Sequence, residues 1–254
     1  MTPLLRVDHV TRRFGGLAAV TDVSFSVERG QLFGLIGPNG AGKTTMFNLI
    51  TGIYTPNEGV ITLEKTRVSG LPPHRITAAG IARTFQNIRL FAGLSVLDNV
   101  KIACHVRQAA PLAASLFRTA GLFRSESRIE DTARRLLAVM NLEDLADETA
   151  GNLPYGLQRR LEIARALATE PRLLLLDEPA AGMNPQESLD LMHLIRRLRD
   201  DFHLTILLVE HNMKVVMGVC ERIHVMDHGV SIAEGTPDEI RRDPKVIEAY
   251  LGGE

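Results

Sequence analysis

Short, almost continuously apolar runs alternate along this chain with segments whose apolar residues recur at helical spacing. Runs of this kind are typical of strands that are buried on both faces of a parallel sheet. The pattern therefore predicts an α/β fold with a mostly parallel sheet covered by helices. We expect the core strands at Leu32–Ile36, Ile81–Phe85, Arg172–Asp177, Thr205–Val209 and Arg222–Met226.

Three earlier segments have a different pattern. Leu5–Val10, Val23–Val27 and Val60–Leu63 are separated by turn residues such as Gly15-Gly16, Gly30 and Asn57-Glu58-Gly59. Tight turns between short strands favour antiparallel pairing. We therefore expect a small antiparallel β subdomain beside the parallel core.

The stretch from Leu94 to Ala150 contains no convincing strand. Apolar residues there, such as Ile129, Ala133 and Leu136, follow helical spacing, which predicts a helical insertion. Its middle, Pro111 to Ser127, is predicted to be a mobile connector. The whole chain, residues 1–254, is expected to form one domain, with the core and β subdomain at about 1–90 and 159–254 and a helical subdomain at about 91–158.

Composition and charge argue against a nucleic-acid-binding protein and against a membrane-spanning one. The formal net charge is −1, whereas a nucleic-acid-binding protein usually has a basic excess, so no nucleic-acid partner is expected. Five arginine pairs are scattered along the chain, Arg159-Arg160 among them, and most of these pairs are interpreted as solvated helix faces. Cys104 and Cys220 are far apart in sequence and are expected to be reduced thiols. No leader and no apolar run of membrane-spanning length is apparent, so we expect a chain that is soluble by itself and reaches a membrane only through a partner.

A glycine-rich stretch follows the predicted strand Leu32–Ile36 and precedes a helical segment. It fits the pattern G-x-x-x-x-G-K-[ST] of a loop that wraps phosphates with backbone N–H groups. Lys43 is expected to reach the β- and γ-phosphates of a nucleotide, and Thr44 is expected to bind Mg²⁺. The predicted nucleotide-binding residues of this loop are Gly37, Pro38, Asn39, Gly40, Ala41, Gly42, Lys43, Thr44 and Thr45.

Two carboxylates end the strand that contains Leu173–Leu176. Asp177 and Glu178 would be costly after four leucines unless they face a polar, cation-containing cleft. Asp177 is suited to holding Mg²⁺ through a water molecule, and Glu178 to acting as general base toward the attacking water. These two motifs alone also fit small GTPases, kinases and helicases, although no Asn-Lys-x-Asp motif of GTPases is present.

Five further features occur in a fixed order along the chain. They are Phe14 before Gly15-Gly16, Gln86 after a core strand, Leu153 to Arg160 ahead of Asp177, Ala181 to Asn184 after the acids, and His211 after Glu210. This ordered set resembles the ABC ATPase family over essentially all 254 residues. The resemblance implies a P-loop NTPase core of the ABC type.

In that family two ATPase domains enclose ATP between the phosphate loop of one and the signature helix of the other. The resemblance implies that Pro154, Tyr155 and Gly156 contact nucleotide as the signature and that Phe14 stacks on adenine. It also implies that Gln86 senses Mg²⁺ and the γ-phosphate and that His211 helps Glu178 position the water. Gln86, Glu178 and His211 are thus the predicted catalytic residues.

The chain departs from the family pattern in two places. Its signature has Pro154 where the family has serine, together with Tyr155 and Leu157 where it has glycine and glutamine, and the later loop has Asn184 where it has aspartate. Loss of the serine hydroxyl removes a hydrogen bond to phosphate worth about 1.5–3 kcal/mol. We therefore expect a weakened composite site and hypothesise a heterodimer with unequal ATP sites, while a homodimer stays open.

The most similar group is the first ATPase subunit of bacterial branched-chain (hydrophobic) amino-acid importers. The stretches that resemble it are residues 80–91, 160–167, 178–185, 210–217, 234–237 and 249–252. The resemblance implies two membrane-spanning permease subunits, a periplasmic or extracellular binding protein, and a peripheral position on the cytoplasmic face of the inner membrane. The alternatives are a lipopolysaccharide-export ATPase, or a soluble ABC ATPase for cofactor assembly or cell division.

Overall fold

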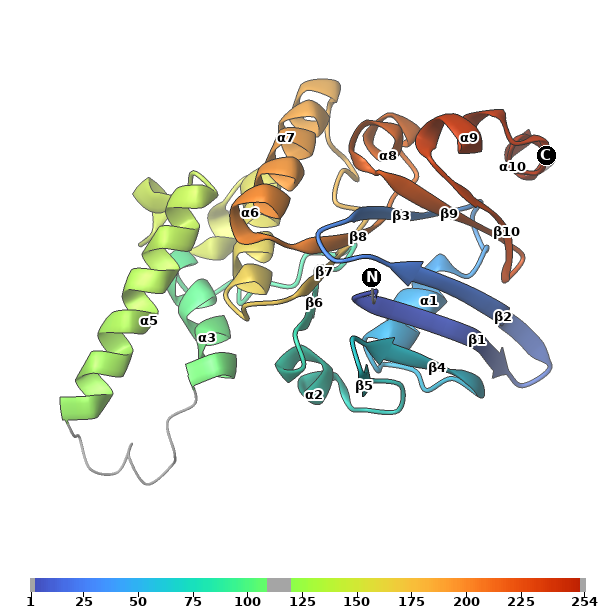
Figure 1. Cartoon of the computed structure of the whole chain (residues 1–254). Helices are drawn as coiled ribbons and strands as arrows, with labels where there is room; N and C mark the ends of the chain where they lie inside the picture. The colour runs from blue at the N-terminus through green and yellow to red at the C-terminus, as the bar shows by residue number, and fades with distance from the viewer. Residues whose placement is uncertain (1–2, 109–119, 252–254) are drawn as a thin grey trace. The chain divides into compact units, whose positions relative to one another are not determined.

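The computed structural model describes residues 3–108 and 120–251 (Figure 1). The chain forms two compact units, one made of Met1–Arg83 and Arg172–Glu254 and the other of Thr84–Pro171. Each unit is described by itself below. The subdomain limits at residues 91 and 158 stay a prediction.

The first unit contains a six-stranded sheet in the order β10-β9-β3-β8-β7-β6. Neighbouring strands from β9 to β6 are parallel, and β10 pairs with β9 in the antiparallel direction. This confirms the predicted mostly parallel α/β fold. The strands are β3 (Leu32–Ile36), β6 (Ile81–Arg83), β7 (Leu173–Asp177), β8 (Thr205–Val209), β9 (Arg222–Asp227) and β10 (Val230–Gly235).

The edge strand β10 was not predicted. Val230–Gly235 is mostly exposed or half-buried, so its sequence lacks the continuous apolar run of a strand covered on both faces. It follows β9 through His228 and Gly229, which both have positive φ. That geometry is typical of a two-residue hairpin turn.

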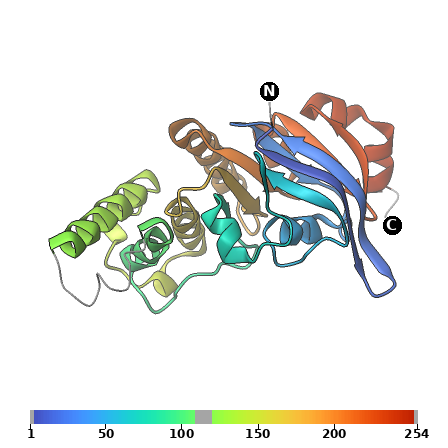
Figure 2. The same ribbon diagram turned by 60° about the horizontal axis from the view of Figure 1, so that its bottom comes forward.

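A second, four-stranded sheet of the same unit is antiparallel, in the order β2-β1-β4-β5. This confirms the expected small β subdomain. Figure 2 shows its two longest strands as a long hairpin. The strands are β1 (Leu5–Phe14), β2 (Leu17–Val27), β4 (Glu58–Leu63) and β5 (Thr66–Arg67).

Helix α1 (Lys43–Ile50) is the element that both sheets share. Its residues Met46, Phe47 and Ile50 are fully buried in one core with side chains from both sheets, including Val7 and Leu175. Burial of such side chains contributes about 1.5–3 kcal/mol each. This packing holds the first turn of α1, which follows the glycine-rich loop, in a fixed place.

The other helices of the first unit complete the layers. Figure 1 shows α7, α8 and α9 on the side of the six-stranded sheet away from the four-stranded one. Asn184 caps α7 through a capping box with Glu187, which satisfies two backbone donors at the helix start. The bounds are α2 (Pro73–Ala78), α7 (Pro185–Phe202), α8 (Met213–Val219), α9 (Pro237–Arg242) and α10 (Pro244–Leu251).

The second unit is helical, as the sequence predicts. It contains α3 (Val96–Gln108), α5 (Ala120–Val139) and α6 (Tyr155–Leu167), with short 3₁₀ turns at Glu143–Leu145 and Ala150–Asn152. The predicted connector Pro111 to Ser127 lies partly outside the described residues, but residues 120–127 begin α5, so for these the prediction is wrong. Within residues 3–108 and 120–251, no helix is both long and apolar enough to cross a membrane.

Candidate functional site

The carboxyl ends of three adjacent parallel strands bring the predicted site residues together. β3 leads into the glycine-rich loop, β7 ends at Asp177 and is followed by Glu178, and β8 is followed by Glu210 and His211. Because β8 lies between β3 and β7, residues far apart in sequence converge at one edge. Ligands of open α/β sheets bind at this edge.

The backbone of the glycine-rich loop requires glycine at specific positions. Gly42 has φ +97°, and a Cβ there would lie 2.6 Å from the carbonyl oxygen of Ala19. At Gly37 a Cβ would lie 2.0 Å from the carbonyl oxygen of Met226. Both positions exclude any side chain, so the loop keeps its backbone N–H groups accessible as an anion cradle.

Helix α1 begins within this glycine-rich motif, at Lys43. Its N-cap is Gly42, in a left-handed conformation and without a capping side chain, so the first backbone N–H groups are left for an outside acceptor. These groups and the helix dipole favour a phosphate at this end.

The side chain of Lys43, the first residue of α1, reaches back into the curve of the glycine-rich loop. Its Nζ donates hydrogen bonds to the carbonyl oxygens of Gly37, at 2.7 Å, and Pro38, at 2.8 Å. Desolvation lowers the pKa of Lys43, and the nearby charges of Glu178 and Asp177 oppose that shift. A buried cation between a phosphate cradle and two carboxylates is placed to bind a polyanion that carries Mg²⁺.

A cavity of about 480 Å³ opens over the loop. It is lined by Asn39–Thr45 and Glu178, together with Leu17–Ala19, His228 and Gly229. Sequence reasoning missed Leu17–Ala19, His228 and Gly229. They come from the β1–β2 and β9–β10 hairpins, and the N–H of Gly229 donates to the carbonyl of Ala41 at 3.1 Å. Gly229 could have indicated a turn from the sequence alone. Its contact with the glycine-rich loop depends on the tertiary fold.

Glu178 has an unusual backbone conformation. Its φ is +45°, which is uncommon for a residue with a side chain. Its N–H donates to the carbonyl of Val209 at 2.8 Å, so the end of β8 holds it in place. Its carboxylate Oε2 lies 3.6 Å from His211 Nδ1. The structure thus brings together the predicted base and the predicted histidine.

Asp177 forms a buried ion pair that the sequence did not reveal. Arg83 at the end of β6 donates to its Oδ2 at 2.6 Å and also to Asn48 Oδ1 of α1 at 2.7 Å. Both members of the pair are only 6% exposed. The arginine therefore joins the acidic strand end to the phosphate-loop helix.

The residues predicted to bind Mg²⁺ offer suitable atoms. Thr44 supplies a hydroxyl at the cavity wall, and Asp177 supplies a carboxylate at the neighbouring strand end. Hard oxygen ligands of this type, supplemented by phosphate oxygens and water, are those that Mg²⁺ prefers. The chain therefore fits the metal, although the assignment of individual ligands stays a prediction.

Phe14 ends β1 but is not among the residues that line the cavity. Its ring contacts Tyr54 edge-to-face, with centroids 5.0 Å apart, and the Arg12 guanidinium lies 4.6 Å from its centroid. The predicted adenine contact of Phe14 stays a prediction.

The remaining predicted site residues belong to the helical unit. Gln86 follows Phe85, and Pro154 is the N-cap of α6, which begins at Tyr155 and Gly156. Arg159 connects the two segments, because it donates to the carbonyl oxygens of Phe85 and Gln86 and, at 3.0 Å, to the Tyr155 hydroxyl. Arg159 is fully buried, so it is an exception to the prediction that most of the arginine pairs lie on solvated helix faces.

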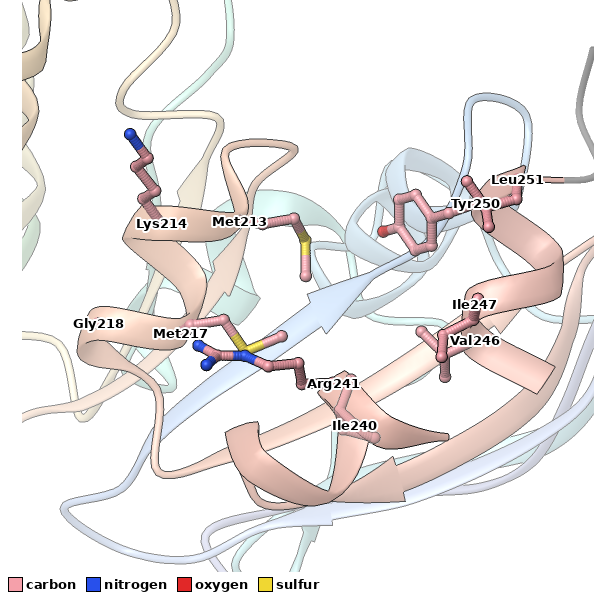
Figure 3. Close-up of a pocket in the computed structure, with 10 residues that line it drawn as sticks. All are labelled: Met213, Lys214, Met217, Gly218, Ile240, Arg241, Val246, Ile247, Tyr250 and Leu251. Atoms are coloured by element: carbon pink, nitrogen blue, oxygen red, sulfur yellow. The ribbon is translucent and has the colours of Figure 1, made fainter. Parts of the chain in front are cut away.

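A second, larger cavity lies elsewhere in the first unit, among α8, α9 and α10, and has a volume of about 670 Å³. Figure 3 shows Met213 and Met217 of α8 on one side of it and Tyr250 and Ile247 of α10 on the other. Burial raises the pKa of Tyr250, and a hydrogen bond from the Gly37 backbone opposes this. The lining is largely apolar, so this groove is not a second phosphate site.

Comparisons with known proteins agree with the geometry. The ABC transporter family profile matches residues 20–181, and a profile for branched-chain amino acid ATP-binding cassette transporters matches residues 232–254. The high-affinity branched-chain amino acid transport ATP-binding protein BraF of Pseudomonas aeruginosa is 48% identical, with 98% of each chain covered. LivG of Escherichia coli, with the same description, is 47% identical at the same coverage.

More distant relatives share the fold. The lipopolysaccharide export system ATP-binding protein LptB of Escherichia coli is 37% identical over 98% of this chain and 97% of its own. Among solved structures, the ADP conformation of an ATP-binding cassette of an ABC transporter matches with a TM-score of 0.86, 32% identity and full coverage of both chains. The chain therefore belongs to the ABC transporter family, as one of its ATP-hydrolysing cassette subunits.

Proposed function

We propose that this chain binds MgATP in the cavity over the glycine-rich loop and hydrolyses it to drive the import of branched-chain or other hydrophobic amino acids. The observation that carries the proposal is the pairing of Lys43 and Glu178 at one cavity. Lys43 lies in the phosphate cradle, and Glu178 lines the same cavity with its carboxylate close to His211. A phosphate-binding cation and a general base are thus within reach of one triphosphate.

Different residues of the chain bind the phosphates, accept the proton and orient the attacking water. Backbone N–H groups of residues 40–44 hold the β- and γ-phosphates, and Lys43 balances their charge. Glu178 accepts the proton of the water that attacks the γ-phosphorus, and His211 orients that water. The bond from the γ-phosphorus to the bridging oxygen breaks, and ADP and phosphate leave. Mg²⁺, held by Thr44 and by Asp177 through water, would neutralise charge on the phosphate oxygens.

A second cassette is required to complete each site. The first turn of α6 offers the backbone N–H groups of Tyr155 and Gly156, which follow the N-cap Pro154, to the nucleotide of the partner cassette. Because Pro154 carries no hydroxyl, the site that this chain completes is weaker than the site that its partner completes. We therefore propose a heterodimer with two unequal ATP sites.

The amino-acid cargo and the location rest on the named relatives. BraF and LivG are described as branched-chain amino acid transport proteins, and their identity to this chain exceeds that of LptB. By analogy the chain would bind two permease subunits on the cytoplasmic face of the membrane. A binding protein on the other face would deliver the amino acid.

The test is purification of the tagged chain from membranes, identification of the bound subunits, and measurement of ATP-dependent leucine uptake into proteoliposomes. We expect a second cassette, two permease subunits, and uptake that is lost with Glu178→Gln. Recovery of lipopolysaccharide-export subunits would contradict the amino-acid cargo. An assembled complex without ATPase activity would contradict the proposed chemistry itself.

A further inference from the structure

Glu210 is a buried carboxylate between two loops of the site. It follows β8 directly, has no exposed surface, and was given no role by the sequence motifs. Its neighbour Val209 accepts the backbone N–H of Glu178. The next residue along the chain is His211.

Both carboxylate oxygens of Glu210 accept backbone hydrogen bonds, and each oxygen serves a different loop. Oε1 accepts from the N–H of Ala180 at 2.7 Å. Oε2 accepts from the N–H groups of His211 and Asn212, each at 3.0 Å. Hydrogen bonds to an ionised acceptor are roughly twice as strong as neutral ones, so this one side chain fixes both loops.

The two loops carry different parts of the site. Ala180 lies two residues after Glu178, in the segment that ends at the α7 cap Asn184, and its carbonyl accepts the N–H of Met183 at 3.1 Å. The other loop carries His211, whose side chain is 61% exposed and lies beside the Glu178 carboxylate. The Nδ1 atom of His211 also lies 3.9 Å from Glu210 Oε2, so this carboxylate contacts both the backbone and the ring of the histidine.

We propose that Glu210 is a positioning residue that fixes the Glu178–Asn184 loop and the His211 loop to each other, so that the base and the histidine keep a common geometry. This role rests on the proposed ATP hydrolysis. It adds a coupling between the loop that follows Glu178 and the loop that carries His211. A movement of the Glu178–Asn184 segment would then be transmitted to His211 through one carboxylate.

The substitution Glu210→Gln tests the coupling at nearly constant volume. The amide replaces one acceptor oxygen by an NH₂ group, which cannot accept from a backbone N–H. One of the two loops must therefore lose its attachment. We expect kcat for ATP hydrolysis to fall roughly 10- to 100-fold, as is usual for a small misplacement of catalytic groups. The KM for ATP should stay within about twofold, since the phosphate loop is untouched.

A double variant separates positioning from a general loss of structure. If Glu210 acts through His211, Glu210→Gln should slow the His211→Ala variant by less than about twofold, because coupled residues are not additive. The matched control is Glu239→Gln, which alters another carboxylate that accepts a backbone N–H, that of Thr236 at 2.7 Å, and should leave turnover unchanged. Multiplicative effects of Glu210→Gln and His211→Ala, together with unchanged amide exchange at Ala180, would overturn the proposal.

Amide hydrogen exchange of the full chain supplies a readout that does not depend on turnover. In the Glu210→Gln variant, peptides covering Ala180 or those covering His211 and Asn212 should exchange faster than in the wild type, while peptides of β7 and β8 keep their protection. Unchanged exchange in both loops would overturn the coupling. If the wild type instead lacks ATPase activity, the proposed function fails, and the exchange data still decide whether Glu210 joins the loops.

Discussion

Arg83 donates a hydrogen bond of 2.6 Å to the Oδ2 atom of Asp177, inside the protein and behind the phosphate loop. The same guanidinium reaches Asn48 of α1. One arginine at the end of β6 therefore connects the strand that carries the acidic pair with the helix that follows the glycine-rich loop. The carboxylate that we propose holds Mg²⁺ and the phosphate cradle are connected by this side chain.

Removal of this arginine should destabilise the fold strongly. In Arg83→Met the Asp177 carboxylate keeps its charge in a buried place but loses its ion pair with the Arg83 guanidinium, which costs about 3–5 kcal/mol. Urea unfolding measures the loss. The control Arg6→Met removes the exposed pair with Asp8 and should cost less than about 1 kcal/mol. Adding Asp177→Asn to Arg83→Met should restore part of the stability, and a further loss would contradict the ion-pair explanation.

Lys43→Ala should weaken nucleotide binding by more than roughly 100-fold, because charge-assisted contacts to the β- and γ-phosphates contribute about 1.5–3 kcal/mol each. The protein should stay folded, since the substitution removes a desolvated cation. Titration with a fluorescent ATP analogue measures the affinity. The exposed Lys245→Ala serves as the control, and near-normal binding by Lys43→Ala would argue against the cradle.

Glu178→Gln should reduce ATP hydrolysis by about 10²–10⁴-fold while ATP binding is retained, because the amide keeps the shape of the side chain but cannot accept the proton. Single-turnover measurements separate this chemical defect from slow product release. Turnover close to that of the wild type would assign the base to another residue, and His211 would be tested next.

Pro154→Ser should improve the composite site without much effect on stability. The serine would cap α6, worth about 1 kcal/mol, but loss of the proline makes the unfolded chain more flexible at a cost of about 0.4–1 kcal/mol. The new hydroxyl can bond phosphate, so the ATP affinity of the site it completes should rise roughly 10- to 100-fold. Equilibrium binding to the assembled complex measures this, and a change in thermal stability alone would contradict it.

Both cysteines should resist alkylation in the native protein at pH 8. Burial raises the pKa of Cys104, and it raises that of Cys220 from 9.0 to about 12. Because the folded state keeps the Cys220 proton more tightly, the free energy of unfolding should fall as the pH rises from about 9 toward about 12. Iodoacetamide labelling followed by mass spectrometry, with a urea-unfolded control, measures the resistance of both cysteines to alkylation. Labelling of the native protein at the unfolded rate would contradict it.

The strands β3 and β8 were predicted with their observed bounds, because each is a continuous apolar run that ends at a polar loop. The phosphate-loop pattern was equally readable, since its spacing alone specifies a turn that glycine must form. In contrast, the edge strand β10 was missed because exposure on one side leaves no comparable pattern. The pattern of apolar residues predicts a strand well where both faces of the strand are buried, and poorly where one face is exposed.

Sequence by itself determined the family, the parallel core and the residue types of the proposed site, because these can be read from short motifs and from their order along the chain. Only the tertiary structure decided which distant residues support them. Arg83 reaches Asp177 across 94 positions, and Glu210 reaches Ala180 across 30. Such pairs arise from the order in which strands join the sheet, and a buried charge finds its partner only once that order places the two side chains together.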